Sequence, residues 1–158
     1  MKTETLDYFD HETQLEAFLA WDDSKPGRKP AVLVAHDWTG RREFAENKAK
    51  EMAKLGYVGF ALDMYGKGVF GADGDVEGNS ALMNPLAGDR AALRQRVLSA
   101  LDVLKKHEQV DSSRVGAMGY CFGGMCVLEL ARSGADVKGV ISCLLYTSPS
   151  PRDVEECG

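Results

Sequence analysis

The stretch Gly119-Tyr120-Cys121-Phe122-Gly123-Gly124 decides the fold, because two segments of different character meet in it. Residues 114–119 are predicted to form a strand and residues 122–133 a helix. A nucleophile at a sharp turn from strand to helix needs small neighbours, because its own strained backbone brings the flanking residues close together. The spacing of the glycines around Cys121 therefore indicates that this residue is a nucleophile.

The helix that is expected to follow Cys121 bears on the reactivity of its thiol. A helix N-terminus stabilises negative charge, so we expect it to lower the pKa of the thiol and to raise the thiolate fraction. The pattern also fits a structural interpretation, in which Cys121 is a buried cysteine beside a glycine-rich turn. Cys126 lies one turn into the same helix, where packing is the simpler interpretation.

The rest of the chain alternates between strand and helix patterns. Residues 30–35 and 57–63 are short apolar runs, typical of strands that are buried on both faces of a parallel sheet. The predicted elements are an antiparallel hairpin over residues 3–9 and 14–21, strands over 30–35, 57–63, 114–119 and 137–142, and helices over 42–55, 89–107 and 122–133. This order predicts an α/β protein with a mostly parallel sheet, an N-terminal antiparallel hairpin and helices on both faces.

The loop His36-Asp37-Trp38-Thr39-Gly40 follows the first short apolar strand and supplies further candidates. Hydrolases with a nucleophile elbow take one oxyanion donor from the residue after the nucleophile and another from a loop in this position. We therefore expect the backbone N–H groups of Phe122 and Trp38 to form an oxyanion hole, with Asp37 accepting a hydrogen bond from the thiol. Alternatively, Asp37 caps its own loop or the following helix. His36 is interpreted as a satisfied histidine at a strand end rather than as a base.

Two other motifs fail in their context. The run Gly66-Lys67-Gly68-Val69-Phe70-Gly71 has the spacing of a dinucleotide fingerprint, but such a fingerprint must open a helix at once, and residues 72–78 have the composition of a loop. The residues from Asp73 imitate the start of a calcium loop, yet its last ligand position holds Asn84 instead of glutamate. We interpret this region as a loop or lid over the site, and we expect no metal or organic cofactor.

Composition restricts the class of protein. The chain has 158 residues, 44% hydrophobic and 27% charged, with a formal net charge of −5. No apolar run reaches the roughly 18 residues of a membrane span, and the start lacks the apolar run of a secretory signal. The acidic balance does not suit nucleic acid as a partner. The sequence therefore predicts a cytoplasmic protein with reduced cysteines that acts on a small molecule.

Three segments together resemble the dienelactone hydrolase family: Val34-Ala35-His36-Asp37-Trp38-Thr39-Gly40, Leu62-Asp63-Met64-Tyr65-Gly66 and Gly119-Tyr120-Cys121-Phe122-Gly123-Gly124. The resemblance runs from the N-terminus to about Ser142. It implies an α/β-hydrolase fold and a Cys-Asp-His triad that opens cyclic esters through an acyl-enzyme thioester, with Cys121 as the nucleophile. The family usually has glutamate where this chain has Asp37, and that acid holds the resting thiol.

The same resemblance places the triad aspartate and histidine after the strand that ends near Ser142, and neither is present in this chain. His11, His36 and His107 all precede Cys121, whereas this fold places the triad histidine last. We therefore expect the parent protein to be a monomeric hydrolase of carboxylic esters or lactones. The chain of 158 residues is expected to be inactive, because deacylation lacks a base.

Residues 143–158 do not continue the alternation of strand and helix patterns seen in the rest of the chain. Residues 143–153, Cys-Leu-Leu-Tyr-Thr-Ser-Pro-Ser-Pro-Arg-Asp, resemble one translated frame of a transposase adapter used to prepare sequencing libraries. A foreign segment is left out of fold reasoning. The expected organisation is therefore an N-terminal part of a single, incomplete α/β-hydrolase domain over residues 1–142, followed by a non-native tail over 143–158.

Two other functions stay open at this point. An enzyme similar to class I glutamine amidotransferases would also carry its cysteine in such an elbow, although the hairpin and the Asp37 loop fit it less well. A non-catalytic α/β binding domain would keep the elbow as a relic. Ester turnover that depends on Cys121 would indicate the hydrolase, glutaminase activity the amidotransferase, and an unreactive thiol the binding domain.

Overall fold

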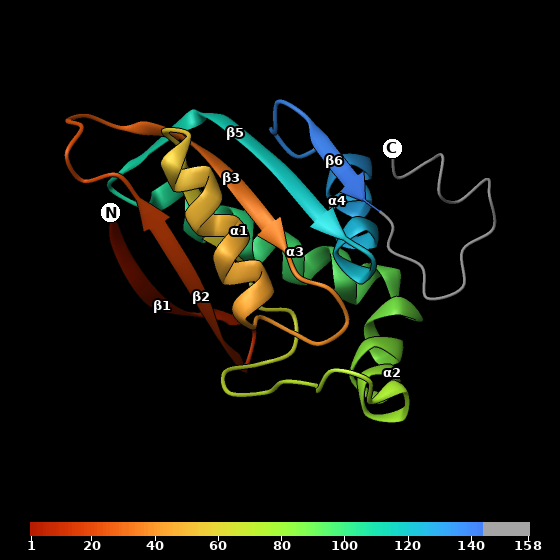
Figure 1. Cartoon of the computed structure of the whole chain (residues 1–158). Helices are drawn as coiled ribbons and strands as arrows, with labels where there is room; N and C mark the ends of the chain where they lie inside the picture. Colours follow the sequence, from red (N-terminus) through yellow and green to blue (C-terminus); the bar gives the residue numbers. More distant parts are fainter. Residues whose placement is uncertain (144–158) are drawn as a thin grey trace, which may run out of the picture.

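One mixed β-sheet organises the chain in a computed structural model, which describes residues 1–143 (Figure 1). Its strands are β1 (Lys2–Asp10), β2 (Thr13–Trp21), β3 (Lys29–Ala35), β4 (Val58–Ala61), β5 (Val110–Tyr120) and β6 (Val140–Cys143), and the helices are α1 (Glu43–Lys54), α2 (Val76–Ala87), α3 (Arg90–Lys106) and α4 (Phe122–Arg132). The strand order is β1-β2-β4-β3-β5-β6. β1 and β2 run antiparallel, whereas β3 to β6 run parallel, which confirms the predicted α/β class and its hairpin.

The parallel strands β4, β3 and β5 bring the candidate segments to one edge of the sheet. Ala61 of β4 lies opposite Val34 of β3, and Ala35 lies opposite Gly119 of β5. In such sheets, ligands bind just beyond the carboxyl ends of the strands. The segments that follow these three strands therefore meet where an α/β protein ordinarily carries its site.

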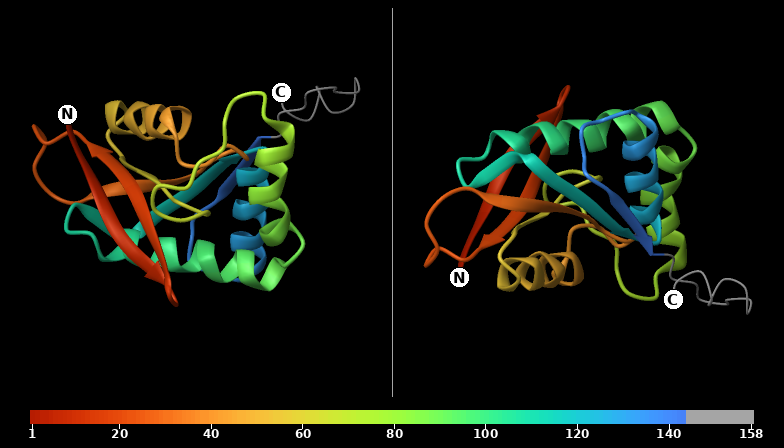
Figure 2. Two further views of the ribbon diagram at one scale, coloured as in Figure 1. Left: turned by 90° about the horizontal axis from the view of Figure 1, so that it is seen from below. Right: turned by 90° about the horizontal axis from the view of Figure 1, so that it is seen from above.

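Helix α1 covers one face of the sheet, and α3 and α4 cover the other (Figure 2). Ala45, Ala49 and Ala53 recur at every fourth position of α1 and are fully buried against β2 and β4. Gly59 of β4 lies so close to α1 that a Cβ atom there would overlap the Ala49 backbone. Small side chains on both elements thus set the distance between α1 and the sheet.

The opposite face holds the larger part of the hydrophobic core. The helix expected over residues 89–107 is confirmed as α3, which buries an apolar stripe made of Leu93, Val97, Leu101 and Leu104. The side chain of Asp89 accepts a hydrogen bond from the Ala92 N–H and caps the start of this helix. Such a cap contributes about 1 kcal/mol to the stability of a helix.

Helix α2 corrects the sequence interpretation. Residues 72–78 were expected to be loop, but the helix begins at Val76, where the Asp75 carboxylate accepts a hydrogen bond from the Gly78 N–H. Gly78 and Pro85 lie inside the helix, and because both residues have a low helix propensity, the sequence does not predict a helix here. The N-cap and packing against α3 and α4 outweigh those two residues.

The expected loop is confirmed over residues 66–75. Gly66 and Gly68 have φ angles of 133° and 77°, and no helix follows Gly71 at once, so the dinucleotide fingerprint fails as expected. The Gly71 N–H donates to the Thr39 carbonyl oxygen at 2.8 Å, so this loop lies against the loop that follows β3.

The last described strand includes the first residue of the predicted tail. Cys143 was assigned to the foreign segment, but it is the final residue of β6, and its carbonyl oxygen accepts the Cys121 N–H at 2.8 Å. The rest of the predicted tail, residues 144–158, lies outside the described residues. Within the described part of the chain, no helix combines the length and the apolar character that crossing a bilayer requires.

Candidate active site

The turn at Cys121 is a strained elbow between β5 and α4. Cys121 has φ 55° and ψ −113°, a conformation that residues other than glycine rarely adopt. A Cβ atom on Gly119 would overlap the Gly123 backbone, and a Cβ atom on Gly123 would overlap the carbonyl group of Ala35. The two glycines are therefore required by the close approach of backbone segments, as the sequence pattern predicted.

The thiol of Cys121 is half-buried, and its pKa is raised above the ordinary value. Burial is the largest cause and the negative charge of Asp37 adds to it, whereas the backbone N–H of Phe122 acts in the opposite direction. The expectation that the helix N-terminus lowers this pKa was wrong, because desolvation of the thiolate outweighs the single amide at the helix start. The shift favours the neutral form of the Cys121 thiol over the thiolate.

Asp37 has two relations in the structure. Its Oδ1 accepts hydrogen bonds from the Thr39 N–H at 2.9 Å and from the Thr39 hydroxyl at 2.6 Å, so the carboxylate caps its own loop. This is the alternative that the sequence left open. Its charge also acts on Cys121, although within residues 1–143 no hydrogen bond joins the two side chains. Asp37 is therefore a neighbour of the thiol that the loop itself holds in place.

The peptide group between Asp37 and Trp38 is held on its carbonyl side. The Asp37 carbonyl oxygen accepts from His36 Nδ1 at 2.6 Å and from the Gly40 N–H at 3.3 Å. In a trans peptide the N–H points away from the C=O. These two contacts therefore fix the direction of the Trp38 N–H, one of the two predicted oxyanion donors. The other predicted donor, the Phe122 N–H, is the first amide of α4, where N–H groups lack intrahelical partners.

None of the chain's three histidines is positioned to act as a base on Cys121. His36 is buried, and both of its ring nitrogens are engaged, because Nε2 accepts the Met64 N–H at 3.0 Å while Nδ1 donates to Asp37. Burial lowers the pKa of His36 and keeps the ring neutral. His11 is exposed in the hairpin turn and His107 contacts Glu4 on β1, as expected for structural positions.

Tyr65 belongs to this site and was missed by the sequence interpretation. Its hydroxyl donates to the Trp38 carbonyl oxygen at 2.8 Å, and its ring stacks on Phe122 with centroids 5.8 Å apart and an interplanar angle of 15°. The only signal available was its place in the Leu62–Gly66 segment, which follows β4. A hydrogen bond between residues far apart in sequence leaves no local pattern.

The surroundings of Cys121 are partly basic. A hollow of about 280 Å³ beside the thiol is lined by Arg90, Arg132, Met125 and Leu128. The nearly buried carboxylate of Glu129 pairs with the guanidinium groups of these two arginines.

Cys126 is fully buried, and burial raises the pKa of its thiol, in agreement with a packing role. Within residues 1–143 no cluster of three or more potential metal ligands occurs.

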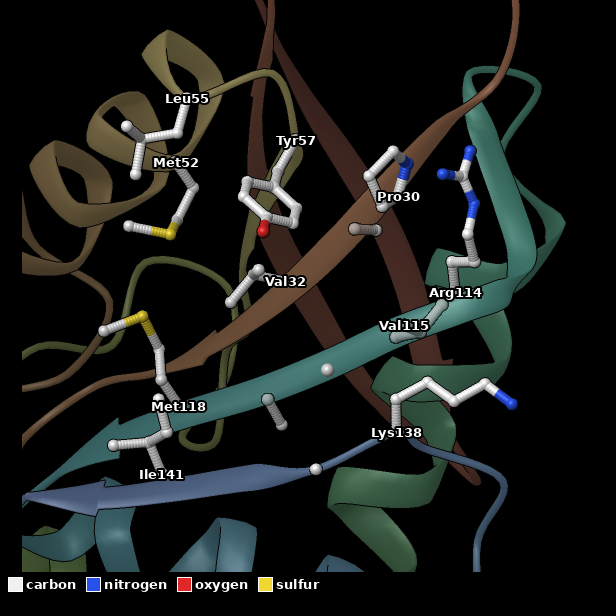
Figure 3. A pocket seen from close by; sticks show the side chains of 14 residues that line it. Pro30, Val32, Met52, Leu55, Tyr57, Arg114, Val115, Met118, Lys138 and Ile141 are labelled. Carbon is white, nitrogen blue, oxygen red and sulfur yellow. The ribbon is translucent and has the colours of Figure 1, made fainter.

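A larger hollow lies away from the elbow. It measures about 560 Å³ and lies between α1 and the strands β3, β5 and β6, where apolar side chains such as Val32, Met52, Met118 and Ile141 line it (Figure 3). None of the predicted site residues lines it. Size alone therefore does not identify the candidate site in this chain, whereas backbone strain and buried polar contacts do.

The chain is similar to known proteins in sequence and in fold. A model of the protein family described as "Dienelactone hydrolase family" matches residues 15–156. The protein named "Probable 2-oxo-3-(5-oxofuran-2-ylidene)propanoate lactonase" from Bradyrhizobium sp is 31% identical over 140 residues, which cover 85% of this chain and 55% of that protein.

Two solved structures share the fold over 99% of this chain. One, named m3DLH, has a TM-score of 0.85 and 36% identity, and the chain covers 65% of it. The other, a dienelactone hydrolase-like promiscuous phosphotriesterase from metagenomic libraries, has a TM-score of 0.85 and 32% identity, with 64% of it covered. The chain therefore spans less than two thirds of the length of each of these relatives.

Proposed function

We propose, since the chain belongs to the dienelactone hydrolase family, that Cys121 attacks the carbonyl carbon of a carboxylic ester or lactone and forms an acyl thioester. The observation that carries this proposal is the strained backbone of Cys121, which Gly119 and Gly123 permit. Strain of this kind is retained in proteins chiefly where it positions a reacting group.

In the proposed acylation, the sulfur of Cys121 forms a bond to the carbonyl carbon, and the carbonyl electron pair moves to oxygen. The N–H groups of Phe122 and Trp38 stabilise this oxyanion, a contribution worth about 3 kcal/mol for one donor in other enzymes. Collapse of the intermediate breaks the bond to the ester oxygen. The thiol proton ends on the leaving alkoxide, which departs as an alcohol or, for a lactone, remains attached as a hydroxyl group.

Hydrolysis of the thioester needs a base that activates water. Both ring nitrogens of His36 are occupied, and the other two histidines of the chain lie away from Cys121. We therefore propose that this chain reacts once and retains the acyl group. The names of the relatives suggest lactones and phosphotriesters as the classes of small-molecule substrate to test first.

The test uses the 158-residue chain and p-nitrophenyl acetate. We expect a burst of p-nitrophenolate without turnover, and a mass increase of one acetyl group at Cys121 in peptide mapping. Cys121→Ser should remove the burst, while the matched variant Cys126→Ser should keep it. Equal acetylation of Cys121 in urea-unfolded chain would contradict the proposal, because the site would then add nothing to the thiol.

A further inference from the structure

Three aromatic rings meet beneath the elbow, each from the end of a different parallel strand. His36 follows β3, Tyr65 follows β4, and Phe122 follows β5 after the Cys121 turn. The Tyr65 ring lies 5.0 Å from His36 and 5.8 Å from Phe122 between centroids. Tyr65 thus contacts both the β3 end and the start of α4, and His36 and Phe122 also contact each other, with centroids 6.1 Å apart.

Tyr65 contacts both residues whose amides are the proposed oxyanion donors. Its hydroxyl donates to the Trp38 carbonyl oxygen at 2.8 Å, and its ring is stacked on the buried side chain of Phe122. The backbone of Tyr65 is itself held, because its N–H donates to Asp63 Oδ1 at 3.0 Å. Asp63 is buried and also accepts the N–H groups of Gly66 and Glu16.

We propose that Tyr65 is a positioning residue that sets the spacing of the oxyanion hole by holding Trp38 through its hydroxyl and Phe122 through its ring. This inference rests on the proposed function, because it assumes that the two amides stabilise an oxyanion. Burial raises the pKa of the Tyr65 hydroxyl, and the nearby Cys126, Asp37 and Cys121 add to this, so the group stays protonated and remains a donor.

Loss of the hydroxyl should affect the two kinds of thiol chemistry differently. Acylation passes through an oxyanion, whereas alkylation by iodoacetamide displaces iodide at a saturated carbon and forms none. A small displacement of a catalytic group can cost up to about a hundredfold in rate, and loss of one oxyanion donor costs about a hundredfold or more. Since Tyr65→Phe leaves both amides in place, we expect acylation of Cys121 to slow about tenfold and alkylation to stay unchanged.

The experiment measures both rates on the 158-residue chain, with p-nitrophenyl acetate and iodoacetamide as the probes. Tyr57→Phe is the matched control, because Tyr57 lines the hollow between α1 and the sheet, away from the elbow (Figure 3). Urea unfolding of each variant shows whether it is folded. If Tyr65→Phe does not fold, Phe122→Leu serves instead, since it removes the stacked ring but keeps the amide, and the same drop in the ratio of the rates is expected.

The outcomes separate the two proposals. A folded Tyr65→Phe with the wild-type ratio of acylation to alkylation overturns the positioning role and leaves the proposed function standing. An equal fall of both rates overturns it as well, because Tyr65 would then only support the elbow. A wild-type chain that is alkylated but not acylated at Cys121 overturns the proposed function and, with it, the role of Tyr65.

Discussion

His36 Nδ1 lies 2.6 Å from the carbonyl oxygen of Asp37, the residue that follows it. The other ring nitrogen, Nε2, accepts the Met64 N–H, so the buried ring joins the end of β3 to the segment after β4. A histidine in this position cannot take a further proton without losing the second hydrogen bond. His36 therefore links two segments of the fold beneath the site, and the stability of the fold should depend on its protonation.

The first prediction concerns stability against pH at His36. Burial holds the pKa of the folded His36 below the ordinary value. Below about pH 6.5 the unfolded chain therefore binds a proton at His36 that the folded chain does not bind. As a result, the free energy of unfolding falls by up to about 1.4 kcal/mol for each unit that the pH is lowered. When the free energy of unfolding is measured with urea between pH 8 and pH 5, it should change less with pH for His36→Asn than for the wild type.

The matched control for this prediction is His11→Asn, because His11 is exposed in the hairpin turn. His36→Asn should also cost about 1–3 kcal/mol at pH 8, since the buried Met64 N–H loses its acceptor. An unchanged pH slope in His36→Asn would show that His36 titrates equally in the folded and unfolded chain.

The second prediction concerns the glycines of the elbow. A methyl group at Gly119 would overlap the Gly123 backbone, whereas one at Gly116 of the same strand would meet only the Gly139 carbonyl oxygen, at 3.5 Å. Gly119→Ala should lower the free energy of unfolding by about 1–3 kcal/mol and slow the acylation of Cys121. Gly116→Ala should change neither the free energy of unfolding, measured with urea, nor the rate of acylation, measured with p-nitrophenyl acetate. Equal effects of the two variants would refute the elbow geometry.

The third prediction concerns the packing of α1. Gly59 leaves no room for a side chain, because its Cβ position overlaps the Ala49 backbone. Gly59→Ala should therefore cost about 1–3 kcal/mol or prevent folding. Gly139→Ala is the control, since a Cβ atom there has no neighbour within 4 Å. A Gly59→Ala chain with wild-type stability in urea would mean that α1 lies farther from β4 than described.

The fourth prediction concerns the charge that acts on the thiol. Burial and the Asp37 carboxylate raise the pKa of Cys121. The rate of its alkylation by iodoacetamide should therefore rise with pH around a midpoint above the ordinary pKa of a thiol. Asp37→Asn removes the charge but keeps an oxygen that can cap the loop, and the midpoint should move to lower pH.

The control for the charge is Asp73→Asn. Asp73 and Asp37 both line a hollow at the start of α1, but Asp73 is not among the groups that shift the pKa of Cys121. It should leave the midpoint unchanged. A wild-type midpoint below the ordinary value would instead mean that the helix N-terminus dominates, as the sequence alone suggested.

Comparison of particular elements shows which features the sequence could predict. A helix over residues 89–107 was expected because an apolar stripe at helical spacing is a local pattern, and α3 spans Arg90–Lys106. Helix α2 was missed because Gly78 and Pro85 argue locally against a helix, while packing against α3 and α4 acts for it. The pKa of Cys121 was predicted with the wrong sign, because the degree of burial at the turn is a property of the whole fold.

The sequence by itself determined the elbow at Cys121, since glycines on both sides of a sharp turn between a strand and a helix are a local requirement of backbone geometry. It also determined the order of the strands and of helices α1, α3 and α4, because hydrophobic periodicity is local. Only the tertiary structure decided that Tyr65 contacts both Trp38 and Phe122, and that burial raises the pKa of the Cys121 thiol. Those properties depend on segments from three strands meeting at one edge of the sheet, where distance in sequence no longer limits contact.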